Sequence, residues 1–264
     1  MKHAALGIAA MLLALGASPA SAHFQELLPS SNILDGENQR NVSISAVFTH
    51  PMEGGPVMNM GQPVKFGVIG REGKVVDLLS TLRSAPINGK QAYAADYKVP
   101  GPANYIFFIE PAPYWEPEEG KMLIHYTKVV VNALGADEGW DQMTGAPIEI
   151  KPLTRPFGLW TGNIFSGIVY YRGKPLPNAR IEVEYASNGK LKLPADAYVT
   201  AVIHDSVGEH PLRPSDAPRP LIWLSGVGAD GVSAFVGDSG HLTLYRQAPR
   251  CCGATRLSRV SVRD

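Results

Sequence analysis

The chain has very little cysteine and no net charge. Its 264 residues include only two cysteines, Cys251 and Cys252, and these are adjacent. A disulfide between neighbouring residues is badly strained, so the sequence excludes a disulfide framework. The 24 basic side chains balance the 24 acidic ones. Because no net field attracts phosphates or anionic lipids, we expect no nucleic-acid partner.

Long apolar runs and familiar catalytic motifs are missing as well. No run after the N-terminus approaches the roughly 20 apolar residues that a transmembrane helix needs, so we expect a chain that does not span a membrane. A P-loop, a GxSxG elbow, an HExxH helix and a CxxC pair are all absent from the sequence. We therefore predict a protein that is not an enzyme.

The first residues have the pattern of a secretory signal peptide. Residues 1–3 are short and basic, residues 4–15 are almost wholly apolar, and residues 20–22 have the small-x-small pattern of a cleavage site. Residues 1–22 are thus predicted to be removed on export. Cleavage after Ala22 would give His23 both a free α-amino group and an imidazole.

Short β-type runs dominate the rest of the chain, and helical periodicity is scarce. Apolar and polar residues alternate over residues 41–48, and residues 64–70, 93–99, 104–110 and 122–133 are further runs of strand length between Gly, Pro or Asn turns. Residues 74–82 are ambiguous. The sequence predicts an all-β protein, with an antiparallel β-sandwich over residues 23–153.

A second β-rich region follows a segment with two prolines and two glycines, residues 150–162, which is typical of a crossing between domains. Within residues 154–204, two β-type runs flank a turn that contains Gly173, Pro175 and Pro177. We expect this hairpin to belong to a second, smaller β-sandwich. Residues 205–264 show little alternation, so the second sandwich is incomplete unless this tail supplies its missing strands.

The densest group of potential metal ligands lies in HPMEGGPVMNM, residues 50–60. His50, Glu53, Met58 and Met60 surround a Gly-Gly-Pro turn there. Imidazole suits zinc, copper and nickel, and thioether sulfur suits soft ions such as Cu(I). In the alternative interpretation the methionines fill gaps beneath a loop and His50 simply ends a strand.

Two further histidines are candidates. The α-amine of His23 loses its proton at modest cost when a metal displaces it, and amine and imidazole then form a chelate. In the alternative interpretation, cleavage of the signal peptide leaves a histidine at the new N-terminus by chance. His125 lies in the strand pattern MLIHYTKVVV, on one face with Leu123 and Thr127. A lone histidine inside a strand is more often structural, so His125 ranks third.

Several long blocks of the sequence span about residues 22–204: AHFQELLPS, FTHPMEGGPVMNM, YIFFIEPAPYWEPEEG, IHYTKVVVNALGADEGWD and PLTRPFGLWTGNIFSGIVYYRGKPLPNARIEVEY. Together these blocks resemble the periplasmic component associated with cobalt/nickel uptake transporters, a family often described as a domain of unknown function. The resemblance implies a periplasmic protein with two β-sandwiches, the second transthyretin-like or carboxypeptidase-regulatory-like. It also implies capture of Ni²⁺ or Co²⁺ for a membrane-embedded cobalt/nickel transporter, and it favours His23 and His50 as ligands.

The C-terminus departs from this family. After about Asp205 the acidic-Gly-aromatic turn, the GWWGF-like block and the final strand of the family are not legible. Our hypothesis is that a frameshift or a sequencing error has replaced the native end. Residues 205–264 are then expected to be atypical or disordered.

Three classes of function remain open. The first is a periplasmic metal-binding component that assists nickel or cobalt uptake without catalysis. Within metal chemistry, copper binding is an alternative because the methionine-rich loop suits Cu(I) better than Ni(II). The second class is a redox enzyme that uses an N-terminal histidine brace on polysaccharide. The third class is an envelope scaffold in which the histidines are incidental.

Overall fold

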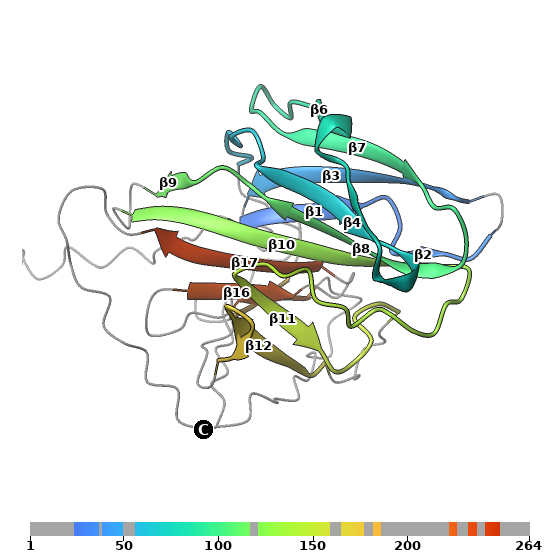
Figure 1. Cartoon of the computed structure of the whole chain (residues 1–264). Coiled ribbons are helices and arrows are strands. Elements are labelled where there is room, and N and C mark those ends of the chain that lie inside the picture. The colour runs from blue at the N-terminus through green and yellow to red at the C-terminus, as the bar shows by residue number, and fades with distance from the viewer. Residues whose placement is uncertain are drawn as a thin grey trace, which may run out of the picture.

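The computed structural model describes residues 24–36, 39–49, 56–116, 121–158, 165–176, 182–185, 222–225, 232–236 and 241–248 (Figure 1). Regular structure in these residues consists of β-strands and two single-turn 3-10 helices, η1 (Arg71–Gly73) and η2 (Leu79–Thr81). The predicted all-β class is therefore confirmed. In the described part of the chain no helix is long and apolar enough to cross a membrane.

The first layer is a four-stranded antiparallel sheet in the order β1-β3-β7-β6. Its strands are β1 (Phe24–Pro29), β3 (Asn41–Thr49), β7 (Tyr93–Lys98) and β6 (Arg83–Ser84). The alternation of residues 41–48 does form a strand, with Val42, Ile44, Ala46 and Phe48 buried in the core. Among the described strands, β1 lies at the edge of this sheet and has β3 as its ladder partner.

The second layer is a larger sheet in the order β16-β17-β10-β8-β4-β5. Its strands are β16 (Val232–Val236), β17 (His241–Ala248), β10 (Lys121–Ala133), β8 (Ala103–Glu110), β4 (Lys65–Ile69) and β5 (Val75–Asp77), with β2 (Ile33–Leu34) and β9 (Tyr114–Glu116) paired to β10. Strand β10 is the long central strand of this layer (Figure 1). Through β17, the described C-terminal residues pair with β10.

An apolar core lies between the two layers. Leu27 of β1, Phe48 of β3, Phe107 of β8 and Val129 and Val131 of β10 all belong to one buried cluster. The described residues thus form a β-sandwich-like arrangement, in which β3 and β8 contribute every second side chain to the core. This arrangement brings the inner face of β10 under the end of β3.

The chain then continues into smaller sheets. Strands β11 (Ile148–Pro152), β12 (Gly167–Tyr171) and β13 (Lys174–Pro175) form an antiparallel sheet, and β14 (Glu182–Tyr185) pairs with β15 (Ile222–Ser225). The predicted hairpin is wrong in its pairing: in the described residues β12 pairs with β11 and with the short β13, which lies inside the expected turn, and β14 pairs with β15 instead of β12. Gly173, in the turn between β12 and β13, takes a φ of +77° that favours glycine. The division into two domains and the origin of residues 205–264 stay predictions.

Candidate functional site

The ends of β1 and β3 that carry two predicted ligands lie directly opposite each other. Phe24 is the partner of Thr49 in the antiparallel ladder. The predicted ligand His23 precedes Phe24 in the chain, and His50 follows Thr49. His23, His50 and Glu53 themselves lie outside the described residues. A peptide link joins consecutive Cα atoms at 3.8 Å, so each histidine is attached directly to one member of this pair.

Phe48 contacts three segments at this end of the sandwich, through Met58, Tyr114 and His125. Its ring lies 5.0 Å from the His125 ring, edge to face, and 4.8 Å from the ring of Tyr114, measured between centroids. Its carbonyl oxygen accepts a hydrogen bond of 2.8 Å from the backbone N–H of Met58. The fold therefore brings two of the predicted ligands, Met58 and His125, to the end of β3.

The two described methionines differ in their surroundings. Met58 is half-buried, and its sulfur lies 4.0 Å from the hydroxyl oxygen of Tyr114. Met60 is only 4% exposed and belongs to the core cluster. A core methionine fills irregular gaps between other apolar side chains. Met60 thus has the surroundings of a core residue, and Met58 packs against the same core from its edge with its sulfur beside Tyr114.

His125 is buried, with 1% of its surface exposed. It lies on the inner face of β10 with Leu123 and Thr127, as the alternation of MLIHYTKVVV predicted. No group of three His, Cys, Asp or Glu side chains suited to a metal ion occurs among the described residues. A metal centre at this end of the sandwich would therefore need donors from residues 23 and 50–55 as well.

Buried polar groups on β1, which the sequence analysis did not identify, lie next to this end of β3. The side-chain nitrogen of Gln25 donates to the carbonyl oxygens of Glu26, at 3.0 Å, and Val47, at 3.1 Å. The Thr127 hydroxyl donates to the carbonyl oxygen of Gln25 at 2.9 Å. Both side chains are buried, so these hydrogen bonds join β1, β3 and β10 inside the sandwich.

Glu26 is a second buried polar residue of β1. Its side chain is 3% exposed, and burial raises the pKa of its carboxyl from 4.5 to about 8. Its Oε1 atom has no hydrogen-bond partner in the described part of the chain. The run FQELLP gives no sequence signal for this burial, because two polar residues in a row fit neither face of a half-buried strand.

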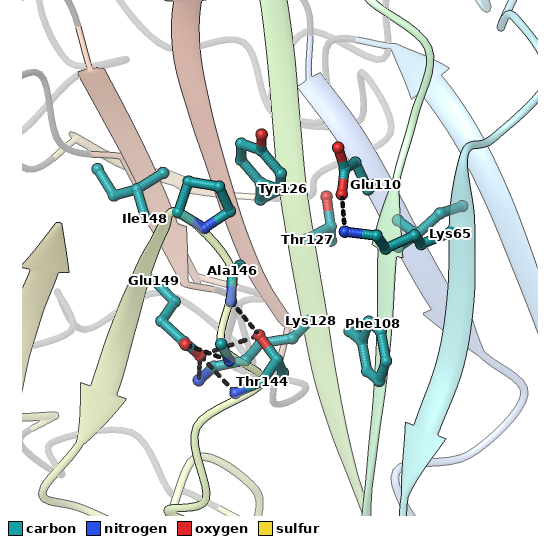
Figure 2. Close-up of a pocket in the computed structure, with 13 residues that line it drawn as sticks. Lys65, Phe108, Glu110, Tyr126, Thr127, Lys128, Thr144, Ala146, Ile148 and Glu149 are labelled. Carbon is teal, nitrogen blue, oxygen red and sulfur yellow. Dashed lines mark hydrogen bonds and ion pairs between the residues drawn. The ribbon is translucent and has the colours of Figure 1, made fainter. Parts of the chain in front are cut away.

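A separate pocket of about 60 Å³ lies on the other side of the larger sheet (Figure 2). Its walls come from β4, β8, β10 and residues 144–149, and its lining includes Lys65, Phe108, Tyr126, Lys128 and Glu149. None of the predicted ligands lines this pocket, so it is distinct from the end of β3.

The lining of the pocket contains a buried ion pair. The Nζ atom of Lys128 lies 2.7 Å from the Oε2 atom of Glu149, and both side chains are almost fully buried. Glu149 also accepts hydrogen bonds from the N–H and hydroxyl of Thr144, at 2.8 and 3.1 Å, and from the N–H of Gly145 at 2.8 Å (Figure 2). Burial lowers the pKa of Lys128, and the nearby Glu149 carboxylate opposes this shift. The network fixes residues 144–149 on the sheet.

A family model described as "Domain of unknown function (DUF4198)" matches residues 20–217. The expected membership of a family of unknown function is confirmed by this match. The matched range contains all six predicted ligands. No curated protein and no solved structure matches the chain.

Proposed function

The chain belongs to the family described as domain of unknown function DUF4198, and from this premise we propose that it is an exported metal-binding protein. It captures Ni²⁺ or Co²⁺ in the periplasm and passes the ion to a membrane-embedded cobalt/nickel transporter, without catalysing a reaction itself. The proposed nitrogen donors are the α-amine and imidazole of His23 and the imidazole of His50. His125, Glu53 and Met58 are the proposed additional ligands.

The observation that carries this proposal is the pairing of Phe24 with Thr49. It holds together the two chain positions to which His23 and His50 are attached. A free amine and an imidazole on one residue form a chelate, and a second imidazole nearby completes three nitrogen donors. Nitrogen donors of this kind bind nickel and cobalt with an affinity that rises along the divalent series.

Copper binding is the second candidate function, and the position of Met58 favours it. The sulfur of Met58 lies 4.0 Å from the Tyr114 hydroxyl, and the rings of Tyr114 and His125 both contact Phe48. A thioether and an imidazole at the same end of the sandwich suit Cu(I) better than Ni²⁺, because sulfur is the softer donor. Under this alternative the protein is a copper-binding protein of the same compartment.

Isothermal titration of the exported, processed protein with Ni²⁺, Co²⁺ and copper ions tests the proposal. Three matched variants accompany it: one with a single extra residue before His23, His50→Gln, and His210→Gln as a control on a histidine outside the predicted set. We expect the extension and His50→Gln each to weaken binding at least about 10-fold, and His210→Gln to leave it unchanged.

The ion bound most tightly decides between nickel or cobalt capture and copper binding. A processed protein that binds none of these ions would contradict both functions, and the scaffold interpretation would then explain the fold better. Full affinity in both the extended chain and His50→Gln would place the metal elsewhere in the molecule.

A further inference from the structure

The pocket of Figure 2 lies where two strands of the larger sheet separate. The ladder between β8 and β10 ends at the pair Ile106–Val130. Beyond this pair both strands continue, without a further ladder pair between them among the described residues. Residues 108–110 of β8 and 126–128 of β10 line the pocket at this place, and residues 144–149 cover it. The arrangement of the strands therefore creates the pocket.

An ion pair lies at the end of the pocket that reaches solvent (Figure 2). Lys65 of β4 and Glu110 of β8 are partners in the antiparallel ladder, and the Nζ atom of Lys65 lies 2.9 Å from the Oε2 atom of Glu110. The Lys65 side chain is 66% exposed and that of Glu110 is 23% exposed. An ammonium has three N–H donors and a carboxylate has two acceptor oxygens, so both groups can make further hydrogen bonds. A ligand at this end meets a cation and an anion side by side.

The second ion pair of the lining is buried and has little capacity left. The Glu149 carboxylate accepts hydrogen bonds from Lys128, Thr144 and Gly145. The Lys128 ammonium also lies 3.5 Å from the carbonyl oxygen of Gln142. These two charges are therefore balanced within the protein, and the charged groups of a ligand are better placed at the solvent end.

The rest of the lining is largely apolar, with Phe108, Pro147, Ile148 and the ring of Tyr126. The position of the Phe108 ring depends on Gly67 of β4. A Cβ atom at Gly67 would lie 2.7 Å from the Cζ atom of Phe108, so a larger residue would displace the ring. A short aliphatic group placed against this lining is removed from water, which favours its binding.

We propose that this pocket binds a small zwitterion with an aliphatic side chain, such as a free α-amino acid. The ligand carboxylate lies against Lys65, its ammonium against Glu110, and its side chain against Phe108 and Tyr126. An anion would be repelled by Glu110 and a cation by Lys65, whereas a zwitterion complements both charges. An apolar lining with a few polar groups that fix the orientation is typical of small-molecule sites. The inference goes beyond metal binding, because none of the predicted ligands lines the pocket.

Isothermal titration of the processed protein with L-leucine and three analogues tests the class of ligand. Isoamylamine lacks the carboxylate of leucine, isocaproate lacks the ammonium group, and glycine lacks the side chain. We expect L-leucine to bind at least about 10-fold more tightly than each analogue, because each analogue loses one of the three contacts. No binding of L-leucine, or a preference of less than about 10-fold over any one analogue, overturns the inference.

Two variants at the solvent end and a matched control test the position of the site. Lys65→Met and Glu110→Gln each remove one charge of a partly exposed pair, which contributes little to stability, so we expect both variants to fold. Arg83→Met is the control, because the Arg83–Asp96 pair is also 2.9 Å long and exposed but joins β6 and β7 of the other sheet. We expect the first two variants to bind L-leucine at least about 10-fold more weakly, and Arg83→Met to bind it as wild type does.

Ala146→Leu is a further variant, which narrows the pocket without changing a charge. We expect it to weaken L-leucine binding at least about 10-fold, with circular dichroism showing that each variant is folded. Wild-type affinity in any of the three pocket variants, or an equal loss in Arg83→Met, contradicts the inference. The metal titration is a separate measurement, so the failure of L-leucine binding and the failure of the proposed function are distinguishable.

Discussion

Phe48 and His125 meet edge to face across the interior of the sandwich, with their ring centroids 5.0 Å apart and their planes at 84°. Phe48 belongs to the four-stranded sheet and His125 to the larger sheet, so the contact joins the two layers. T-shaped ring pairs stabilise a core beyond the area that they bury. The contact also fixes the imidazole beneath the strand end that leads to His50.

Met58 and Met60 are expected to respond differently to substitution. Met58→Leu removes a half-buried thioether near the His125 end of the sandwich, so we expect lower Cu(I) affinity and little change in Ni²⁺ affinity. Met60→Leu replaces one core side chain by another of similar volume and should cost less than about 1.5 kcal/mol of stability without changing metal affinity. Competition with a coloured Cu(I) chelator and thermal unfolding measure both effects. Loss of Cu(I) binding in Met60→Leu would contradict this assignment.

The buried Glu26 carboxyl predicts a pH-dependent stability. Its pKa is raised from 4.5 to about 8 in the folded chain, so between these values the unfolded chain has lost a proton that the folded chain retains. The contribution of Glu26 to the free energy of unfolding is therefore fully present below about pH 4.5. It falls as the pH rises towards 8, by roughly 5 kcal/mol at most. Glu26→Gln carries no such proton and should become more stable relative to wild type as the pH rises.

Urea unfolding of wild type and Glu26→Gln at pH 5 and pH 8 measures this difference. Glu72→Gln, a change on an exposed side chain, is the control and should stay within about 0.5 kcal/mol of wild type at both pH values. A stability difference between wild type and Glu26→Gln that is the same at both pH values would show that the carboxyl does not titrate in this range.

The Lys128–Glu149 pair is expected to behave as a coupled unit. Lys128→Met leaves a buried carboxylate without its cation, and Glu149→Gln leaves a buried ammonium without its anion, so each should cost about 3 kcal/mol or more. The double variant buries no net charge, and its glutamine keeps one of the two oxygen acceptors that the N–H groups of Thr144 and Gly145 use. We expect it to cost clearly less than the sum of the single variants.

A double-mutant cycle by urea unfolding measures the coupling free energy of this pair. The pair lies beside the separate pocket of Figure 2, away from the predicted ligands, so all three variants should bind Ni²⁺ as wild type does. Additive losses would show that the two charges do not depend on each other, and a loss of metal affinity would link this pocket to the metal site.

The sequence predicted the strands well wherever alternation is local. Residues 41–48 and 122–133 correspond to β3 and β10, and the shared face of Leu123, His125 and Thr127 is confirmed. The ambiguous residues 74–82 hold strand β5 followed by η2. In that segment the Asp77 side chain accepts a hydrogen bond from the N–H of Leu79, which favours a turn over a longer strand.

The buried polar residues could not be predicted, because their burial depends on contacts between distant segments. The pattern of β10 assigns Lys128 to the outer face, which is normally exposed, and residues 144–147 with the start of β11, which carries Glu149, cover it there. Gln25 is buried because β1 packs against both β3 and β10. For the proposed site, the sequence indicated which residue types could bind a metal. The register of β1 with β3 adds that Phe24, next to His23, and Thr49, next to His50, are partners in one ladder.

The hydrogen bond from Met58 to the Phe48 carbonyl also has a consequence for contacts between molecules. The ladder between β3 and β7 ends at Ala46 and Tyr93, so β7 does not cover the last residues of β3. Unpaired backbone groups on a strand edge are a template on which a strand from another chain adds, which leads to aggregation. Met58 occupies an acceptor on this edge. The segment that brings a thioether to the proposed metal site therefore also shields the sheet from edge-to-edge association.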